Sequence, residues 1–483
     1  MIIIDAEDGE EFQSQNFEIF TFNQIVEAGR ENPQPLPKIN EDHILFINFT
    51  SGTTGMPKAT MVSHKNMVSY MQCHAETGIF ETDLRGANVF AFNPLAHILE
   101  RLMLLNQFKF EMRQSIWCGD QDQFFKEIAL TNPKIFVTVP RIWRKIQSMI
   151  KKELKNIPNV SEEEVLQAIE QKIKYKRETG LCFHKELDTK IFSHLSKILG
   201  NDVELVISAA THLDNRLKEF ISVTLCVPFV EGWGMTEISG FGSYTRQNDP
   251  TPNIVGGPTP NFEFKLREVP DSVYNVSYRD ENGNSRPRGE ICFRGESVFE
   301  GYYQDPEATE RTIDSEGWIH SGDIGELIPE KGAFKIIDRK KNIFYLASGA
   351  SITPEIIESK YIQAPGLSEA LITWNKDKSG LIGVFSFDMH QIPSLVQKIG
   401  IEEMNETNLK DFVRNPALRE FYLNEFYQIH LNNNMKENEK LRDFRFVSND
   451  FNSCGFMTST HKIQRIKARH HLSYNNEVKD ILV

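Results

Sequence analysis

The chain has 483 residues, 40% of them hydrophobic, and a formal net charge of −13 at pH 7. This length predicts two to four domains with well-filled cores. Because the basic residues are scattered and the net charge is negative, the composition argues against nucleic acid as a partner, although a nucleotide would need only local positive charge. The six cysteines show neither a Cys-x-x-Cys pair nor the spacing of metal ligands, which indicates reduced thiols in a protein that faces the cytosol.

No segment has the pattern of a targeting or membrane-spanning sequence. The opening Met-Ile-Ile-Ile is too short for the apolar part of a signal peptide, and acidic residues follow at once. No run of 18 apolar residues occurs, so we expect no transmembrane segment in this chain.

Short apolar strands alternate with helical patterns through about residue 240. We expect strands over residues 44–49, 134–139 and 203–208, and a helix over residues 213–223. This alternation favours a layered α/β domain with mostly parallel sheets.

A long and highly charged insertion occupies residues 141–180. Within it, Ser161 and Glu164 have the spacing of a capping box, which predicts the start of a helix. Three apolar residues at helical spacing predict the packed face of that helix: Leu166, Ile169 and Ile173.

From residue 253 to about residue 330 the chain changes to short β segments separated by Gly, Pro and Asn turns. This pattern predicts a small β-rich subdomain over residues 253–330. A strand end and a charged link follow, and we place the domain boundary near Asp338. Residues 1–337 would then form a large α/β domain and residues 338–483 a smaller α+β domain.

The segment over residues 46–64 predicts a phosphate-binding loop. Gly52 and Gly55 can take positive φ, so successive backbone N–H groups can point into one concavity. Hydroxyl donors and a mobile positive charge are added by Thr50, Ser51, Thr53, Thr54 and Lys58. Met56 and Pro57 separate the last glycine from the lysine, so the loop is not that of P-loop NTPases, and an ordinary turn is the alternative interpretation.

A second informative segment reads Glu231-Gly-Trp-Gly-Met-Thr-Glu237. Its glycines, Gly234 among them, give access to the backbone, and Trp233 offers a stacking face. A carboxylate close to a triphosphate usually holds Mg²⁺, which prefers oxygen ligands. Gly-aromatic-Gly by itself also occurs in plain turns.

Together these segments resemble the motifs of a known family. The string Thr-Ser-Gly-Thr-Thr-Gly-x-Pro-Lys resembles the AMP-binding signature of the adenylate-forming enzymes, and the second segment resembles the family's next motif. The resemblance implies Thr236 on the phosphate, Glu237 on the metal and Trp233 against the adenine. Residues 208–212 stand at the adenine-binding turn, which implies Ala210 as a nucleotide contact.

Two further motifs follow in the family's order. His320-Ser-Gly-Asp323 stands where the family has Thr-Gly-Asp, which implies that the aspartate, Asp323, accepts both ribose hydroxyls. The run Asp-Arg-Lys-Lys-Asn-Ile stands at the interdomain link. It implies Arg339 on the ribose or phosphate and Lys341 at the pivot of a hinge over residues 338–342.

Three segments resemble the long-chain fatty acyl-CoA synthetases within this family. Residues 93–101 match their pattern, with His97 next to the acyl entrance, although a histidine in an apolar stretch is usually a core residue. Val-Pro-Arg-Ile-Trp143 also resembles them and implies an aromatic gate on a fatty-acid tunnel. Residues 457–465 resemble their C-terminal motif, in which Lys462 is the catalytic lysine.

The resemblance implies a long-chain fatty acid:CoA ligase that uses ATP, Mg²⁺ and coenzyme A. ATP would adenylate the fatty acid with release of pyrophosphate, and the coenzyme A thiol would then take the acyl group. In this family the smaller domain rotates between the two steps, which withdraws Lys462 and presents the loop around Gly349 to coenzyme A. The implied location is cytoplasmic, either free or peripheral on the endoplasmic reticulum or another membrane.

The sequence departs from the family pattern in two ways. Only about 50 residues precede the Thr/Gly loop, where the family has about 100–200. We therefore expect an N-terminally incomplete large domain with bare apolar faces, from a truncated sequence or a shortened paralogue. Ala209, Asn342 and Ala350 also replace family residues. The alternatives are an adenylating enzyme with another acyl acceptor and a non-catalytic or partly active paralogue that binds nucleotide or acyl chain.

Overall fold

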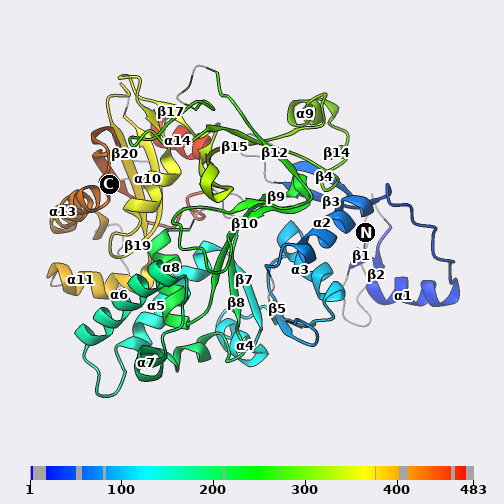
Figure 1. The fold of residues 1–483 in the computed structure, drawn as a ribbon, viewed down its shortest axis with the longest axis horizontal. Coiled ribbons are helices and arrows are strands. Elements are labelled where there is room, and N and C mark those ends of the chain that lie inside the picture. The colour runs from blue at the N-terminus through cyan, green and yellow to red at the C-terminus, as the bar shows by residue number, and fades with distance from the viewer. Residues whose placement is uncertain are drawn as a thin grey trace. The chain divides into compact units, whose positions relative to one another are not determined.

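The structure is a computed structural model of the chain, drawn in Figure 1. It describes residues 2–3, 18–50, 57–79, 83–209, 213–270, 272, 274–375, 377–401, 412–457 and 463–474. The chain divides into two compact units, Met1–His43 and Ile44–Val483.

The first unit holds a two-stranded parallel sheet and one helix. β1 (Ile2–Ile3) pairs with β2 (Phe20–Thr21), and α1 (Phe22–Glu31) follows directly. The Thr21 hydroxyl accepts the backbone N–H of Gln24, and the Gln24 side chain accepts the backbone N–H of Thr21. This reciprocal capping satisfies donors that the start of a helix leaves open.

A five-stranded sheet forms the centre of the second unit. Its order is β11 (Gly257–Pro258), β10 (Gly240–Tyr244), β9 (Phe229–Met235), β8 (Leu205–Ser208) and β7 (Ile135–Thr138). β7, β8 and β9 are parallel, and β10 and β11 are antiparallel. The α/β class is therefore confirmed, with a parallel centre that continues into antiparallel strands. The helix predicted after β8 is α8 (Asn215–Leu225), two residues later than expected.

Helices cover both faces of this sheet, as Figure 1 shows. Alternate residues of a strand point to opposite faces. Phe136 and Val206 accordingly belong to a core with α5 (Pro140–Leu154) and α8, whereas Ile135 and Ile207 belong to a core with α2 and α3. The other helices of this part are α2 (His64–Glu76), α3 (Ile98–Lys109), α4 (Phe124–Thr131), α6 (Glu162–Thr179) and α7 (Lys185–Leu187).

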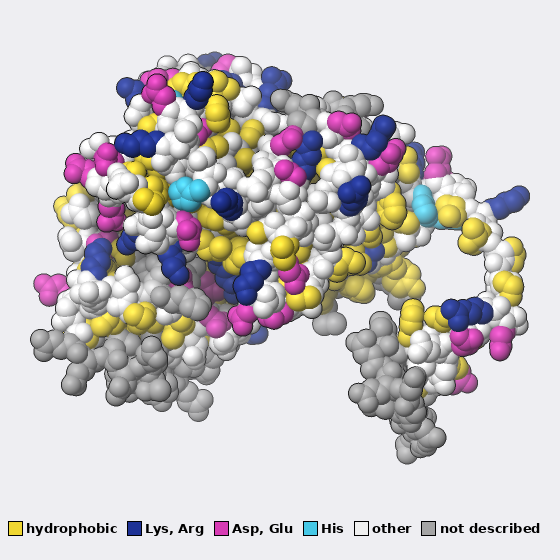
Figure 2. Space-filling model, turned by 90° about the horizontal axis from the view of Figure 1, so that it is seen from below, with side chains coloured by type: hydrophobic (Ala, Val, Ile, Leu, Met, Phe, Trp, Pro, Cys, Tyr) yellow, Lys and Arg dark blue, Asp and Glu magenta, His cyan; other side chains and the backbone are white. Residues whose placement is uncertain are grey.

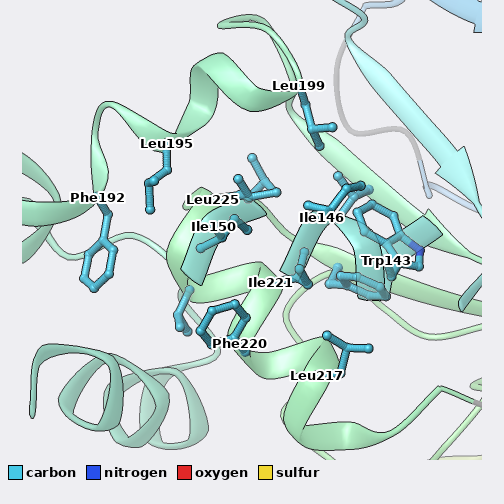
Figure 3. Close-up of a cluster of buried hydrophobic side chains, with 14 of the residues drawn as sticks. Trp143, Ile146, Ile150, Phe192, Leu195, Leu199, Leu217, Phe220, Ile221 and Leu225 are labelled. Atoms are coloured by element: carbon cyan, nitrogen blue, oxygen red, sulfur yellow. The ribbon is translucent and has the colours of Figure 1, made fainter. Parts of the chain in front are cut away.

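The core of α5 and α8 is drawn in Figure 3 and encloses Trp143. Trp143 is fully buried, with ring centroids 5.6 Å from Phe136 and 5.0 Å from Phe229. The predicted capping box of Ser161 and Glu164 is confirmed at the start of α6. The predicted packing face of α6 is wrong in part, because Leu166 is 59% exposed.

The strand predicted over residues 44–49 exists, but it does not join a parallel sheet. β3 (Ile44–Thr50) forms an antiparallel hairpin with β4 (Lys58–Ser63), and β14 (Gly301–Tyr302) pairs with the other edge of β4. A separate parallel pair consists of β5 (Asn88–Ala91) and β6 (Arg113–Ile116). The predicted phosphate-binding residues therefore run from the last residue of β3, Thr50, to the first residue of β4, Lys58.

The β-rich part expected after residue 253 is an antiparallel sheet. Its order is β12 (Glu263–Arg267), β13 (Arg288–Arg294), β15 (Ile319–Ile328) and β16 (Ala333–Arg339). α9 (Pro306–Thr312) lies between β14 and β15 in the chain. β16 ends at Arg339, one residue beyond the predicted boundary.

The chain after β16 forms a smaller α+β part with a core of its own. β19 (Leu367–Trp374), β20 (Leu381–Phe387) and β21 (Leu441–Phe446) make its three-stranded sheet. α10 (Pro354–Tyr361), α11 (Ile392–Ile399), α13 (Pro416–Asn432) and α14 (Arg465–Tyr474) are its helices, and β17 (Phe344–Tyr345) and β18 (Ser351–Ile352) form a small ladder. Buried aromatic residues such as Phe385, Tyr422 and Phe426 fill the core.

Acidic and basic side chains are interspersed on the face drawn in Figure 2, and apolar side chains reach the surface between them. Several large apolar residues of β3, α2 and α3 are exposed: Phe49 (64%), Val68 (51%) and Phe108 (70%). None of the helices that the structure describes is both long enough and apolar enough to cross a bilayer.

Candidate active site

The β3–β4 hairpin places Thr50 opposite Lys58, one on each side of the predicted phosphate loop. The loop residues themselves lie outside the described residues, so the roles of Ser51, Gly52, Thr53, Thr54 and Gly55 stay predictions. The Lys58 ammonium lies 4.4 Å from the ring centroid of Tyr302, on the neighbouring strand β14. An aromatic face at this distance holds a cation without neutralising it.

Tyr302 connects Lys58 to Glu237. Its hydroxyl donates a hydrogen bond of 2.8 Å to Glu237 Oε1. Burial and the Glu237 carboxylate raise the pKa of Tyr302 well above its ordinary value, so the hydroxyl keeps its proton. Glu237 is only 8% exposed and lies in the short turn Thr236–Ile238 that follows β9. A buried carboxylate, a phenol and a lysine thus meet at the start of β4, the strand that follows the predicted phosphate loop in the chain.

Trp233, Asp323 and Arg339 form a second group next to the first. The Trp233 indole N–H donates to Asp323 Oδ2 at 2.9 Å, and Arg339 Nε lies 3.2 Å from Asp323 Oδ1. Asp323 and Arg339 are opposite each other in the β15–β16 ladder, and Asp323 raises the pKa of Arg339. Both oxygens of the predicted ribose aspartate therefore have protein partners, which a sugar would share or displace.

The indole ring of Trp233 also stacks on Phe293, with a centroid distance of 5.3 Å and an interplanar angle of 19°. One face of the ring is therefore covered by protein. The adjacent Gly234 is required by packing, because a Cβ at this position would lie 1.9 Å from the carbonyl oxygen of Gly240. The glycine allows β10 to pair closely with β9 at the site.

Ser321 fixes the loop that carries Asp323. Its hydroxyl donates to the carbonyl oxygen of Ile291 at 2.7 Å and accepts the backbone N–H of Asp323 at 3.1 Å. The serine therefore supplies the hydroxyl that the threonine of the family motif would supply.

The segment around the predicted hinge is held on two sides. Lys340 lies 3.1 Å from Glu290 of β13, and Asn342 donates to Glu355 of α10 at 2.8 Å. Lys341 is exposed between them. Gly349 has a φ of +80°, and its backbone N–H donates to the carbonyl oxygen of Leu346 at 2.9 Å, so a glycine suits this turn.

His97 caps the helix α3. Its Nδ1 accepts the backbone N–H of Leu99 at 3.3 Å at the start of α3. The same segment is bound to β3, where the Asn48 side chain donates to the carbonyl oxygen of Ala96 at 3.1 Å. The role of His97 at an acyl entrance stays a prediction, as does the gate role of the enclosed Trp143.

Two further predicted residues, besides those of the phosphate loop, lie in segments outside the described residues. Ala210 follows Ala209, which is buried in the core of α2 and α3 and donates its N–H to the carbonyl oxygen of Thr138 at 3.1 Å. Lys462 precedes Ile463, which forms a β-bridge with Met457. The assigned roles of Ala210 and Lys462 stay predictions.

Within the described ranges, no three His, Cys, Asp or Glu side chains come together as metal ligands do. A single carboxylate is nevertheless compatible with Mg²⁺, which is usually bound by one or two carboxylates together with substrate phosphates and water. Glu237 fits this role because it is buried, accepts a neutral donor on one oxygen and is joined through Tyr302 to Lys58, which follows the predicted phosphate loop in the chain.

The sequence did not identify Tyr302 as part of this site. Its only local signal is a Gly-Tyr-Tyr run, and its partner Glu237 lies 65 positions away in the chain. The contact arises because β14 adds to the edge of β4, a pairing between distant segments that no local pattern indicates.

Comparison with known proteins gives a family match and similar sequences. A family model described as AMP-binding enzyme matches residues 1–303. Long chain acyl-CoA synthetase 6, peroxisomal, of Arabidopsis thaliana is 30% identical over 95% of this chain and 64% of its own length. Long-chain-fatty-acid–CoA ligase 5 of Rattus norvegicus is 31% identical over 93% of this chain and 64% of its own length. The chain thus spans somewhat less than two thirds of these relatives.

Solved structures give the same fold. The adenylation domain of a carboxylate reductase from Mycobacterium chelonae matches with a TM-score of 0.69 and 22% identity, over 95% of this chain and 64% of that chain. The corresponding domain from Segniliparus rugosus, in complex with AMP and a co-purified carboxylic acid, matches with a TM-score of 0.69 and 22% identity, over 95% of this chain and 66% of that chain.

Proposed function

Because the chain belongs to the AMP-binding enzyme family, we propose that it acts as a long-chain fatty acid:CoA ligase. In this proposal ATP adenylates a fatty acid with release of pyrophosphate, and coenzyme A then takes the acyl group from the acyl-AMP. The relatives that suggest this activity are named for it, and the chain matches 64% of their length.

The observation that carries the proposal is the convergence of the predicted nucleotide residues. Lys58 and Glu237 meet through Tyr302, and Asp323 contacts Trp233 and Arg339. The two groups are close enough for the Glu237 carboxylate to help raise the pKa of Arg339. Thr236 begins the turn that carries Glu237. A phosphate beside Lys58 and a ribose beside Asp323 would each meet groups of the required charge and hydrogen-bonding type.

The chemistry needs charge compensation more than a general base. A carboxylic acid with a pKa near that of Asp or Glu, about 4, is already ionised at pH 7 and is a nucleophile as it stands. Its approach to the α-phosphate is opposed by like charge. In the proposal, Lys58, Arg339 and Lys462 offset this repulsion, and Mg²⁺ bound to Glu237 would neutralise phosphate charge.

The second step would use the part of the chain after the hinge. We propose residues 1–337 as the large domain, residues 338–483 as the mobile domain, and the segment 338–342 as the hinge with Lys341 at its pivot. The loop around Gly349 would then face coenzyme A. Ala350 and Asn342 replace family residues in these segments, so the thioester step is where a partly active paralogue would differ. The cytoplasmic or membrane-surface location stays a prediction.

The test separates the two half-reactions. Lys462→Ala should lower acyl-AMP formation, measured as pyrophosphate release with fatty acids of graded length, by about 10²-fold or more. Thioester formation from supplied acyl-AMP and coenzyme A should be spared. Lys467→Ala is the matched control, since Lys467 is an exposed lysine close by on α14.

Equal loss of both half-reactions in Lys462→Ala would contradict the role of Lys462. Acyl-AMP formation without any acyl-CoA would favour an adenylating enzyme with another acyl acceptor. Absence of both products in the wild-type chain would favour a non-catalytic paralogue.

A further inference from the structure

Contacts between charged and polar side chains join the predicted hinge to the start of α14. Asp338 is 1% exposed and accepts the backbone N–H of Glu355 at 3.0 Å and the Asn342 amide at 3.3 Å. The same amide donates to Glu355 Oε1 at 2.8 Å. Arg465 lies 3.8 Å from that oxygen and also contacts Glu358. We call Asp338, Asn342, Glu355, Glu358 and Arg465 the hinge cluster.

The fork between Arg465 and Glu358 is the shortest contact of the hinge cluster. Both terminal guanidinium nitrogens reach the carboxylate, with an Nη2–Oε2 distance of 2.5 Å. Glu358 is 8% exposed and also accepts the backbone N–H of Ile372 at 2.7 Å, which ties it to β19. Burial opposes the charge of Arg465, but Glu358 raises its pKa above the ordinary value. Such a planar pair is geometrically specific, and a lysine cannot reproduce it.

A β-bridge lies just before Arg465 in the chain. Met457 and Ile463 form an antiparallel β-bridge. Gln464 reinforces this bridge, because its backbone N–H donates to the carbonyl oxygen of Phe456 and its side chain to that of Met457, each at 2.7 Å. The bridge joins the two ends of residues 458–462. The fork on Glu358 therefore fastens the bridge to α10.

Loss of Arg465 should cost more than the loss of one ion pair, because Arg465 contacts more than one carboxylate. Arg465 is the one cation of the hinge cluster and contacts Glu355 and Glu358. Burial raises the pKa of Asp338 and Glu358, and Arg465 opposes this rise at both carboxyl groups. Removal of one partner of a buried pair leaves an uncompensated charge, which costs far more than the pair contributes. Loss of Arg465 would both release the start of α14 and set these carboxylates against one another.

We propose that Arg465 is a positioning residue of the adenylation step, which holds the Met457–Ile463 bridge to α10 and, through Glu355, to the predicted hinge. This inference rests on the proposed function in one respect, the role given to Lys462, whose neighbour Ile463 forms the bridge. Arg465 acts through the chain and not by contact with the substrate.

The first experiment compares the two half-reactions in Arg465→Gln. Acyl-AMP formation should fall by about 10²-fold, because a small displacement of a catalytic group has effects of this size. Thioester formation from supplied acyl-AMP should change little, whereas a loss of structure would lower both steps equally. Arg465→Lys keeps the charge without the fork and should restore only part of the activity.

The matched control is Arg419→Gln. Arg419 also joins a helix to the sheet of this part of the chain, with Nη2 2.7 Å from Asp443 and Nη1 donating to the carbonyl oxygen of Phe444 at 3.2 Å. It has no contact with the hinge cluster among the interactions of the described residues. Its substitution should leave the ratio of the two half-reactions unchanged.

A second experiment does not depend on activity. Arg465→Gln should raise the initial rate of tryptic cleavage after Lys462, followed by mass spectrometry, by about tenfold, and Arg419→Gln should not. Unchanged cleavage, or equal loss of both half-reactions, would overturn the proposal. If the wild-type chain forms no acyl-AMP, the proposed function fails, and the cleavage rate alone decides whether Arg465 holds the bridge.

Discussion

The hinge cluster and the helix pair α6–α8 both bury charged side chains, but the excess charge has opposite sign in the two places. The hinge cluster sets three carboxylates against Arg465. Between α6 and α8, Lys172 pairs with Asp188, and Lys176 donates to the Ser222 hydroxyl without a carboxylate of its own in that contact. We call Lys172, Lys176 and Asp188, with the Ser222 and Val223 groups that they contact, the lysine cluster.

A helix end compensates the excess in each cluster. Lys172 Nζ contacts Asp188 and donates to the carbonyl oxygen of Val223 at 2.5 Å, in the last turn of α8, where the helix dipole favours cations. Asp338 accepts a backbone N–H at the first turn of α10, where the dipole favours anions. Burial and Glu355 nevertheless raise the pKa of Asp338 well above its ordinary value.

The difference lies in which segments the two clusters join. The lysine cluster joins two helices of one packed core, so its contacts serve stability. The hinge cluster joins Asp338, at the end of β16, to α10 and α14, on the other side of the predicted hinge. Changes in the lysine cluster should therefore alter the free energy of unfolding, and changes in the hinge cluster should alter the balance of the two half-reactions.

The largest effect on stability is expected from Lys172→Met. Lys172 is fully buried, and its loss leaves the Asp188 carboxylate, 5% exposed, without its cation. Removal of one partner of such a pair typically costs about 3–5 kcal/mol. Urea denaturation should show this loss, while the ratio of the half-reactions stays constant. Lys174→Met, at a position 79% exposed on the same helix, is the control and should leave stability unchanged.

If Lys172→Met were as stable as the wild-type chain, the lysine cluster would not hold α6 to α8. A changed ratio of the half-reactions at full folding would contradict the proposed division between the two clusters.

Lys176→Met should change the free energy of unfolding by a smaller amount and in the opposite direction, so that the variant is more stable at pH 7. Burial lowers the pKa of Lys176 from 10.5 to about 8, so the unfolded chain keeps this proton over a pH range in which the folded chain has lost it. The free energy of unfolding of the wild-type chain should therefore rise between pH 8 and 10.5, by at most about 3 kcal/mol. The variant should lack this rise and be more stable at pH 7.

The Lys176→Met variant leaves no hydroxyl unsatisfied, because Ser222 still donates to the carbonyl oxygen of Val227 at 2.7 Å. Denaturant titrations at pH 7 and pH 10, compared with Lys174→Met, measure the effect. A variant that keeps the rise above pH 8 would show that another group titrates there.

The lysine cluster also explains where sequence reasoning failed for α6. The helix and its capping box are local signals and were predicted correctly. The buried face, however, consists of Val165, Ala168, Ile169, Lys172 and Lys176. Two of these positions are lysines, so a search for apolar residues selected Leu166, which is exposed. Asp188 and the C-terminal part of α8, which lie elsewhere in the chain, make lysines suitable at these positions.

In the sheets and the site, too, features with a local sequence signal were predicted, and features that depend on contacts between distant segments were not. β7 and β8 are short apolar runs buried on both faces, a pattern visible in the sequence. β4 was not predicted, because its hairpin partner and its neighbour β14 decide its conformation. Glu237, Asp323 and Arg339 were found from motif resemblance, whereas Tyr302 and Glu358 depend on pairings between distant segments.

The smallest effect on the free energy of unfolding is expected from Asn342→Asp. This variant also tests most directly whether the hinge cluster, unlike the lysine cluster, controls the balance of the two half-reactions. The Asn342 amide donates to both Asp338 and Glu355, and an aspartate would replace this donor by a third carboxylate at the same place. The expected cost at pH 7 is about 1 kcal/mol in the free energy of unfolding, as for the loss of one or two hydrogen bonds. Acyl-AMP formation should fall relative to the thioester step, because the hinge would be held less tightly to α10.

The destabilisation caused by Asn342→Asp should depend on pH. A carboxylate beside two others has a raised pKa, and its protonated form can donate as the amide does. The cost of Asn342→Asp should therefore shrink as the pH falls from 7 to 5. Asn284→Asp is the matched control: Asn284 donates to Asp280 at 3.0 Å, but in an exposed turn where water screens the added charge. A cost that is equal in both variants, or independent of pH, would mean that the excess acid of the hinge cluster does not control the hinge.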